Sequence, residues 1–410
     1  MKYSIKIAAI VCASLFFNFQ FSNFNSAKAQ SPFNLEWHGF VNPHYYADSR
    51  SVVGGREDMM LFYPKPILRD SLGHDINDGW QANMLAITAR LGLRVNGPEM
   101  LGAKASAYIE GDFTGSTNAT INNLRLRHAY IDLNWEYHRL LAGQYWYAMV
   151  VHEIMPMTNP LNMGAPFHCY ARQPQVRYEY HLGGIEAVAV AQWQLDNMSQ
   201  GLLNGAPASS TLFSRHSLVP ELNVQFRYRH GALFVGAAVN AKTIQPVVNT
   251  IGVAAVQNLH TSLTYSVFGS LKAGPVTIKA QTLLNNSLYE GCSLGGYIIY
   301  TSVMGDDMMF RDWTFNTVWL DVERNHGHWR PGLFMGYAQK QDEGPVLAIY
   351  STTAVLGRGH DMDYLWRIQP RLTYKTLTGL DFTGEVEYTR AGYADPVGNL
   401  RLSLSMVYSF

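Results

Sequence analysis

Apolar and polar side chains alternate along residues 399 to 410. One face carries Leu400, Leu402, Leu404, Met406, Tyr408 and Phe410, and the other carries Arg401, Ser403, Ser405 and Ser409. This period of two is typical of a β-strand. A strand of this length, with one wholly apolar face, suits an oblique crossing of a bilayer with lipid on one side and water on the other. The pattern predicts a membrane strand that ends at Phe410.

The same alternation recurs along most of the chain. We expect strands at residues 34–47, 81–96, 103–114, 124–135, 139–147, 173–182, 185–195, 219–230, 232–242, 259–272, 275–287, 311–324, 328–339, 361–376 and 380–392, and at the C terminus. Short turns alternate with long segments at 48–80, 148–171, 196–218, 243–258, 288–310 and 340–360. The fold class expected is therefore all-β: a transmembrane antiparallel β-barrel of about 16 strands with short periplasmic turns and long extracellular loops, wide enough for a water channel.

Charged residues on these strands are expected to point into the lumen. An arginine that faces lipid at mid-depth costs about 2–4 kcal/mol, which the opposite face avoids. The candidate pore-lining residues are Arg90, Arg125, Arg127, Arg172, Arg177, Glu179, Arg227, Arg367 and Arg371. We expect lumen carboxylates on other parts of the wall, such as Glu110, Asp112, Glu179, Glu385 and Glu387, to create a transverse field across the channel.

The strand at 124–135 changes phase in its middle. Leu124 and Leu126 share a face with Ala129, Ile131 and Leu133 only if one residue is inserted near His128. Such an insertion is a β-bulge. It would turn Arg125, Arg127, Tyr130 and Asp132 inward.

The N-terminal residues have the features of an export signal. Lys2 and Lys6 precede an apolar stretch at 7–17, and Ala27-Lys28-Ala29 forms a cleavage site. We expect residues 1–29 to be a signal peptide, cleaved after Sec export, and residues 30–410 to form a single barrel domain. The mature chain has no apolar run long enough for a membrane-spanning helix, which favours a barrel in a Gram-negative outer membrane.

Composition and short motifs give little evidence for any other chemical function. Lys+Arg and Asp+Glu both number 31, and no basic patch indicates a nucleic-acid partner. After cleavage Cys169 and Cys292 remain, and both a disulfide and two free thiols are compatible with their spacing. The acids at 306–307 and 361–363 could hold Ca²⁺ but are better explained as solvated loop acids. We expect no cofactor, no metal site and no enzymatic activity.

Two stretches resemble a known family. Residues 142–146 (AGQYW) and 171–178 (ARQPQVRY), with 124–130 (LRLRHAY) upstream, are similar to the corresponding stretches of DcaP-like outer-membrane porins, the dicarboxylate porin group. The resemblance implies a sixteen-stranded homotrimeric barrel whose third long loop folds inward, and passage of small, mostly anionic solutes. The small residues that face outward along 185–195 would let a neighbouring barrel approach. Members can carry an N-terminal helical extension, whereas here the first expected strand begins soon after the cleavage site.

The segment 148–171 is unusually apolar for a loop in water. It contains Met149, Val150, Val151, Ile154, Met155, Met157, Leu161, Met163 and Phe167. Packed inside the barrel, it would narrow the lumen and place Arg172 and Arg177 beside the gap, near Arg127. A loop folded over the mouth, or into a subunit interface, with the arginines held by carboxylates such as Glu179, is the alternative.

Two other classes of function remain open at this point. A structural or adhesive barrel would have no open pore. A barrel enzyme such as an outer-membrane lipase would need a catalytic serine and histidine at the rim, and the sequence has no nucleophile elbow.

The terminal aromatic residue gives a test of the barrel. Deletion of Phe410, or its replacement by a charged residue, should strongly reduce insertion into the outer membrane, because this residue ends the strand that closes the barrel and addresses it to the assembly machinery. The amount of heat-modifiable folded protein in outer-membrane fractions measures this. Wild-type yields from the deletion variant would contradict the barrel.

Overall fold

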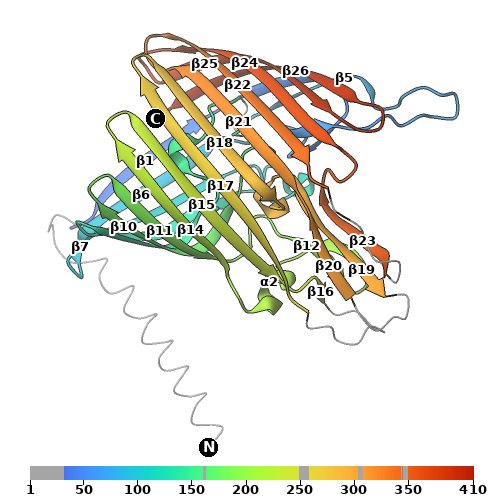
Figure 1. Cartoon of the computed structure of the whole chain (residues 1–410). Helices are drawn as coiled ribbons and strands as arrows, with labels where there is room; N and C mark the ends of the chain where they lie inside the picture. The colour runs from blue at the N-terminus through green and yellow to red at the C-terminus, as the bar shows by residue number, and fades with distance from the viewer. Residues whose placement is uncertain (1–31, 160–162, 249–257, 303–307, 343, 345–349) are drawn as a thin grey trace, which may run out of the picture. The chain divides into compact units, whose positions relative to one another are not determined.

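The computed structural model describes residues 32–159, 163–248, 258–302, 308–342, 344 and 350–410. Within the unit Leu35–Phe410 the chain forms a closed antiparallel barrel of sixteen strands (Figure 1), as the alternation predicts. The expected signal peptide, together with Asp306, Asp307 and Leu161, lies outside the described residues. No described helix is long and apolar enough to cross a membrane.

Eighteen strands make up the main sheet, because two of the sixteen barrel strands are interrupted. They are β1 (Asn34–Val41), β2 (His44–Arg50), β5 (Asp78–Leu85), β6 (Arg90–Met100), β7 (Ala103–Asp112), β8 (Arg125–Asn134), β9 (His138–Trp146), β10 (Arg172–Leu182), β11 (Ile185–Gln192), β14 (Glu221–His230), β15 (Leu233–Ile244), β17 (His260–Ala273), β18 (Val276–Asn286), β21 (Phe315–Arg324), β22 (Trp329–Lys340), β24 (Tyr364–Lys375), β25 (Leu380–Ala391) and β26 (Val397–Ser409). The last strand pairs with β25 on one side and with β1 and β2 on the other, which closes the ring.

The two interruptions correct the expectation of continuous strands at 34–47 and 81–96. Between β1 and β2 lies Pro43, which has no N–H to donate to a neighbouring strand. Its carbonyl still accepts a hydrogen bond from the backbone N–H of Met406, at 3.1 Å. Between β5 and β6 the chain makes a turn in which the N–H of Ala89 donates to the carbonyl of Ala86, at 3.1 Å.

The two faces of the strands differ as the alternation predicts. On β14, Leu222, Val224 and Phe226 are exposed on the outside of the barrel, whereas Asn223 and Gln225 are buried inside it. An exposed belt of large apolar side chains is unfavourable in water and suits hydrocarbon. The barrel therefore has the surface of a membrane-spanning protein.

The predicted bulge in β8 is confirmed. Glu110 of β7 pairs with His128 and Gly111 pairs with Leu126, which leaves Arg127 as the inserted residue. The side-chain amide of Gln144 donates to the carbonyls of Leu126 and Arg127, at 3.0 and 3.1 Å, so both carbonyls at the bulge are satisfied.

Seven turns of two to four residues lie at one end of the barrel, the turn end (Figure 1). The long connections, and the short segment 392–396 between β25 and β26, lie at the other, the loop end. The long connections, expected to be plain loops, contain β3 (Val52–Gly55), β4 (Met60–Pro64), β12 (Gln200–Leu203), β13 (Ala206–Ser209), α2 (Leu212–Ser217), β16 (Val247–Val248), β19 (Gly295–Ser302), β20 (Met308–Trp313) and β23 (Tyr350–Arg358), and the 3-10 turns Asn118–Thr120, His152–Ile154 and Tyr289–Gly291. The expected strand at 311–324 therefore divides, because residues up to Trp313 pair with β19 instead of the barrel wall.

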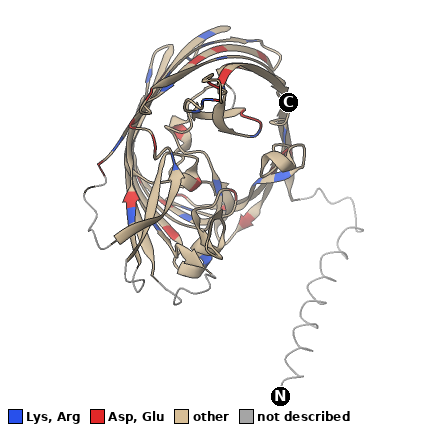
Figure 2. Ribbon diagram, turned by 90° about the vertical axis from the view of Figure 1, so that its right-hand side faces the viewer, with Lys and Arg blue, Asp and Glu red and all other residues tan. Residues whose placement is uncertain are grey.

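The described part of the segment 147–171, here called the inner loop, lies inside the barrel. Its Phe167 packs against Phe334 on the inner face of β22, with ring centroids 6.3 Å apart. The backbone N–H groups of Met157 and Asn159 donate to the inward carboxylates of Asp321 and Glu385, at 3.1 and 3.0 Å. Figure 2 shows chain segments within the ring of strands. The apolar content of this segment is thus explained by burial.

The outward face gives a second test. Val386 is 43% exposed at the middle of β25, whereas Thr383 of the same strand lines an internal cavity. Val386→Arg should lower the free energy of unfolding in lipid vesicles by about 2–4 kcal/mol, because it places a charge in hydrocarbon. Thr383→Arg, which faces water, should change it far less. Urea titrations of the two variants compare them directly, and equal losses would contradict the assigned faces.

Candidate functional site

Two internal cavities meet in the middle of the barrel. The turn-side cavity has a volume of about 690 Å³ and the smaller arginine cavity, on the loop side, about 170 Å³. Both are lined by Arg90, Arg127 and Tyr170, so these side chains lie where the cavities adjoin. The site is therefore built from one wall of the barrel, the end of the inner loop and further loops at the loop end.

The wall at β6, β7 and β8 carries arginines and carboxylates in alternation. Arg127 Nε donates to Glu110 Oε1 at 2.6 Å, and its Nη1 donates to Asp112 Oδ2 at 2.8 Å. Glu110 also lies 3.5 Å from Arg90, and Asp112 accepts from Arg125 at 2.9 Å. Buried charges of this kind are stable only when paired and hydrogen-bonded, which these contacts provide.

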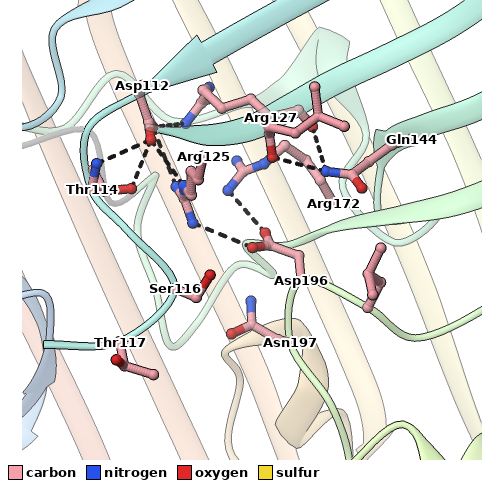
Figure 3. Close-up of polar contacts among 12 residues, drawn as sticks. Asp112, Thr114, Ser116, Thr117, Arg125, Arg127, Gln144, Arg172, Asp196 and Asn197 are labelled. Carbon is pink, nitrogen blue, oxygen red and sulfur yellow. Dashed lines mark hydrogen bonds and ion pairs between the residues drawn. The ribbon is translucent and has the colours of Figure 1, made fainter. Parts of the chain in front are cut away.

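Asp196, in the loop after β11, extends this ion-pair network to Arg172 at the start of β10 (Figure 3). Its two carboxylate oxygens lie 3.3 Å from Arg125 Nη1 and 3.0 Å from Arg172 Nη2. The guanidinium carbon of Arg172 also lies 5.1 Å from the ring centroid of Trp146 and 5.1 Å from that of Tyr170. Arg172 is fully buried and lines neither cavity, so it fixes the end of the inner loop to the wall.

The carboxylates do not occupy a separate wall, which corrects the expected transverse field. Glu110 and Asp112 alternate with arginines on one wall. Glu385 accepts hydrogen bonds from the inner loop at Asn159, and Glu387 pairs with Arg367 at 3.0 Å. Most of these charges compensate their neighbours, because unpaired charges cannot be buried at low cost.

Arg177, Glu179 and Arg227 lie together in a third cavity of about 410 Å³, away from the arginine cavity. Arg177 Nε donates to Glu179 Oε1 at 2.5 Å, and Glu179 also lies 3.2 Å from Arg139. Arg227 lies 3.5 Å from Glu153 of the inner loop.

The last two candidates have different surroundings. Arg367 donates to the backbone carbonyls of Leu61, Phe62 and Ala165, at 3.1, 3.1 and 2.8 Å, and lines none of the three cavities described above. It holds two loops and does not face open lumen, because those loops fill the lumen at its level. Arg371 lines the turn-side cavity and pairs with Asp321 at 2.7 Å.

Several residues of the site, Asp196 among them, lie outside the set predicted from the sequence. Arg56 and Arg358, from the loops at 51–77 and 341–363, line the arginine cavity, and Tyr170 of the inner loop lines both cavities. Alternation assigns faces only within strands, so it contains no signal for the direction of a loop side chain.

Cys169 and Cys292 are both free and buried. They lie on loops joined by a hydrogen bond from the N–H of Tyr170 to the carbonyl of Gly291, at 2.7 Å. Burial raises the pKa of both thiols, so they stay protonated and unreactive at neutral pH.

No protein-family model matches this chain, and no curated protein matches it. Solved structures similar to it include three outer-membrane channels. The outer membrane channel DcaP of Acinetobacter baumannii has a TM-score of 0.65 at 20% identity, covering 94% of this chain and 100% of that one. An anion-selective porin from Comamonas acidovorans has a TM-score of 0.55 at 10% identity, covering 92% and 100%. Salmonella typhi OmpF with daunomycin has a TM-score of 0.52 at 11% identity, covering 92% and 98%. At these identities the likeness is one of fold.

Tyr170 makes the site sensitive to pH. Burial raises the pKa of Tyr170, but Arg172, Arg127 and Arg125 together outweigh it and lower the pKa to about 7, with Asp112 acting in the opposite direction. The phenol is therefore neutral below this pH and negative above it. Any attraction of the site for anions should weaken as the pH rises from 6 to 8, because the new charge offsets one arginine.

Reversal potentials across a salt gradient at several pH values measure this effect. Tyr170→Phe should remove the dependence, whereas Tyr145→Phe, in the turn-side cavity, should keep it. An unaltered pH profile in Tyr170→Phe would contradict the assignment.

Proposed function

We propose that this chain is an outer-membrane porin, a passive diffusion channel for small hydrophilic solutes with a preference for anions such as dicarboxylates. One observation carries the proposal: two adjoining cavities lie inside a closed barrel, and arginines line the point where they adjoin. The barrel fold, with the solved porins similar to it, supports the channel.

The charges of the lumen explain the expected preference. The turn-side cavity is lined by more basic than acidic side chains, the basic ones being Arg90, Arg94, Arg127, Arg139, Arg330, Arg371 and Lys375, against Glu110, Asp132, Glu323 and Asp381. Fixed charge of one sign in a narrow, low-dielectric passage concentrates ions of the opposite sign. Salt screens this effect over about 8 Å at physiological ionic strength, so the preference should be greater in dilute salt.

The setting of the channel belongs to the same proposal. Residues 30–410 would form the barrel in the Gram-negative outer membrane, with the turn end in the periplasm and lipid around the apolar belt. We expect a homotrimer, in which the outward Ala187, Ala189 and Ala191 of β11 permit close packing of barrels.

Planar-bilayer recording tests this function. The purified full-length mature protein should form open channels whose reversal potential in a KCl gradient has the sign of chloride selectivity, with the shift growing as salt is diluted. Liposomes containing the protein should swell faster in succinate than in a neutral sugar of similar size. A barrel with no conductance would favour a structural role, and ester hydrolysis without conductance would favour an enzyme.

A further inference from the structure

The arginine cavity contains more positive charge than its ion pairs account for. Five arginines line it, Arg56, Arg90, Arg125, Arg127 and Arg358, and no described Asp or Glu does. Arg90, Arg125 and Arg127, with Arg172 behind them, share the carboxylates of Glu110, Asp112 and Asp196. The wall thus keeps one positive charge in excess, four guanidiniums against three carboxylates. Arg56 and Arg358 add two more, so they carry most of the excess charge of the cavity.

Arg56 is positioned by a strained turn. It lies between β3 and β4, and Arg56, Glu57 and Asp58 have φ angles of 59°, 55° and 58°. A left-handed backbone costs about 1–2 kcal/mol for each residue with a side chain, so the surrounding contacts must maintain this turn.

Arg401 supplies two of these contacts, by donating to the carbonyls of Asp58 and Met59 at 2.7 and 3.0 Å. Among the described residues no carboxylate forms an ion pair with Arg56, and its buried Nε has no hydrogen-bond partner. Burial, and then the charge of Arg125, lower the pKa of Arg56, as expected for a cation with too few counter-charges.

Arg358 is held by groups that leave its charge uncompensated. Its Nη1 donates to the carbonyls of Ser293 and Tyr289, at 2.9 and 3.3 Å. The rings of Phe62 and Tyr289 lie 4.2 and 4.5 Å from its guanidinium carbon. In the described part of the chain it has no carboxylate partner. Carbonyls and aromatic faces orient a guanidinium but do not cancel its formal charge.

We propose that Arg56 and Arg358 form a saturable binding site for a small oxyanion in the arginine cavity, and that these two loop residues, not the paired arginines of the wall, determine its affinity. This inference rests on the proposed function, because the site lies on the path of the solute. A guanidinium offers two parallel N–H donors that match the two oxygens of a carboxylate or phosphate. At about 170 Å³ the cavity takes a compact anion.

Block of chloride current by succinate, and separately by inorganic phosphate, tests the site in planar bilayers. Wild-type protein should show saturable block by at least one of the two ions. The double variant Arg56→Gln with Arg358→Gln should raise the half-blocking concentration at least about tenfold. One lost charged hydrogen bond already lowers the affinity by about this factor. Comparison of the two ions shows whether carboxylate or phosphate is preferred.

The control is Arg330→Gln. Arg330 lines the turn-side cavity, donates to the carbonyl of Gly327 at 3.1 Å and has no ion pair among the described residues, so the variant removes the same unpaired charge outside the arginine cavity. It should leave the half-blocking concentration within about twofold of wild type. The single variants Arg56→Lys and Arg358→Lys, which retain charge, should leave chloride preference intact but weaken block, because an ammonium lacks the paired donors.

Two failures can be told apart. A wild-type channel without chloride preference would overturn the proposed function. A chloride-selective wild type whose block is unchanged in the folded double variant, or absent for both ions, would overturn the site alone. Heat-modifiable migration of each variant verifies that its barrel has folded.

Discussion

Hydrocarbon offers no hydrogen-bond partner to a peptide group, and the rest of this structure depends on that constraint. Each unpaired N–H or C=O in lipid costs several kcal/mol, so a membrane sheet must have no free edge. Here β26 meets both β25 and the first strands of the chain. The irregular positions obey the same constraint. The carbonyl of Pro43 accepts from Met406, and Gln144 satisfies the carbonyls at the bulge of β8.

The same reasoning applies to charges within the lumen. The inner loop and the β3–β4 hairpin fill much of the barrel, and arginines that would otherwise face water become buried beneath them. Arg367 and Arg401 bind loop carbonyls and acids, and so act as structural ties between the loops and the wall. The number of lumen arginines is therefore a poor measure of the electric field in the lumen. That field depends on the charge that ion pairs leave uncompensated.

The barrel could be predicted from the sequence because each strand has lipid on one face, and lipid enforces alternation. Even the bulge at Arg127 was visible as a change of phase. The break at Pro43 was not predicted, because the apolar pattern continues through it. At residues 86–89 the apolar face shifts from even positions, such as Met84, to odd positions, such as Leu91, and this change of phase does not by itself separate a break from a bulge. Nor could the roles of Arg56, Asp196 and Arg358 be predicted. The direction of a loop side chain depends on contacts with distant segments, such as that between Asp58 and Arg401, and these leave no periodic trace.

The division of charge between wall and loops has an evolutionary consequence. Substitution of Arg125 or Arg127 leaves Asp112 with less compensation, so change in the wall must occur in matched pairs to preserve folding. Arg56 is positioned by its turn, and Arg358 is held by backbone carbonyls and aromatic rings, so neither has a carboxylate partner among the described residues that would be left unpaired. Each can therefore be exchanged singly. Under the proposed function, selection would thus alter the solutes that this barrel accepts through its loops, where variation is tolerated, while the scaffold stays unchanged.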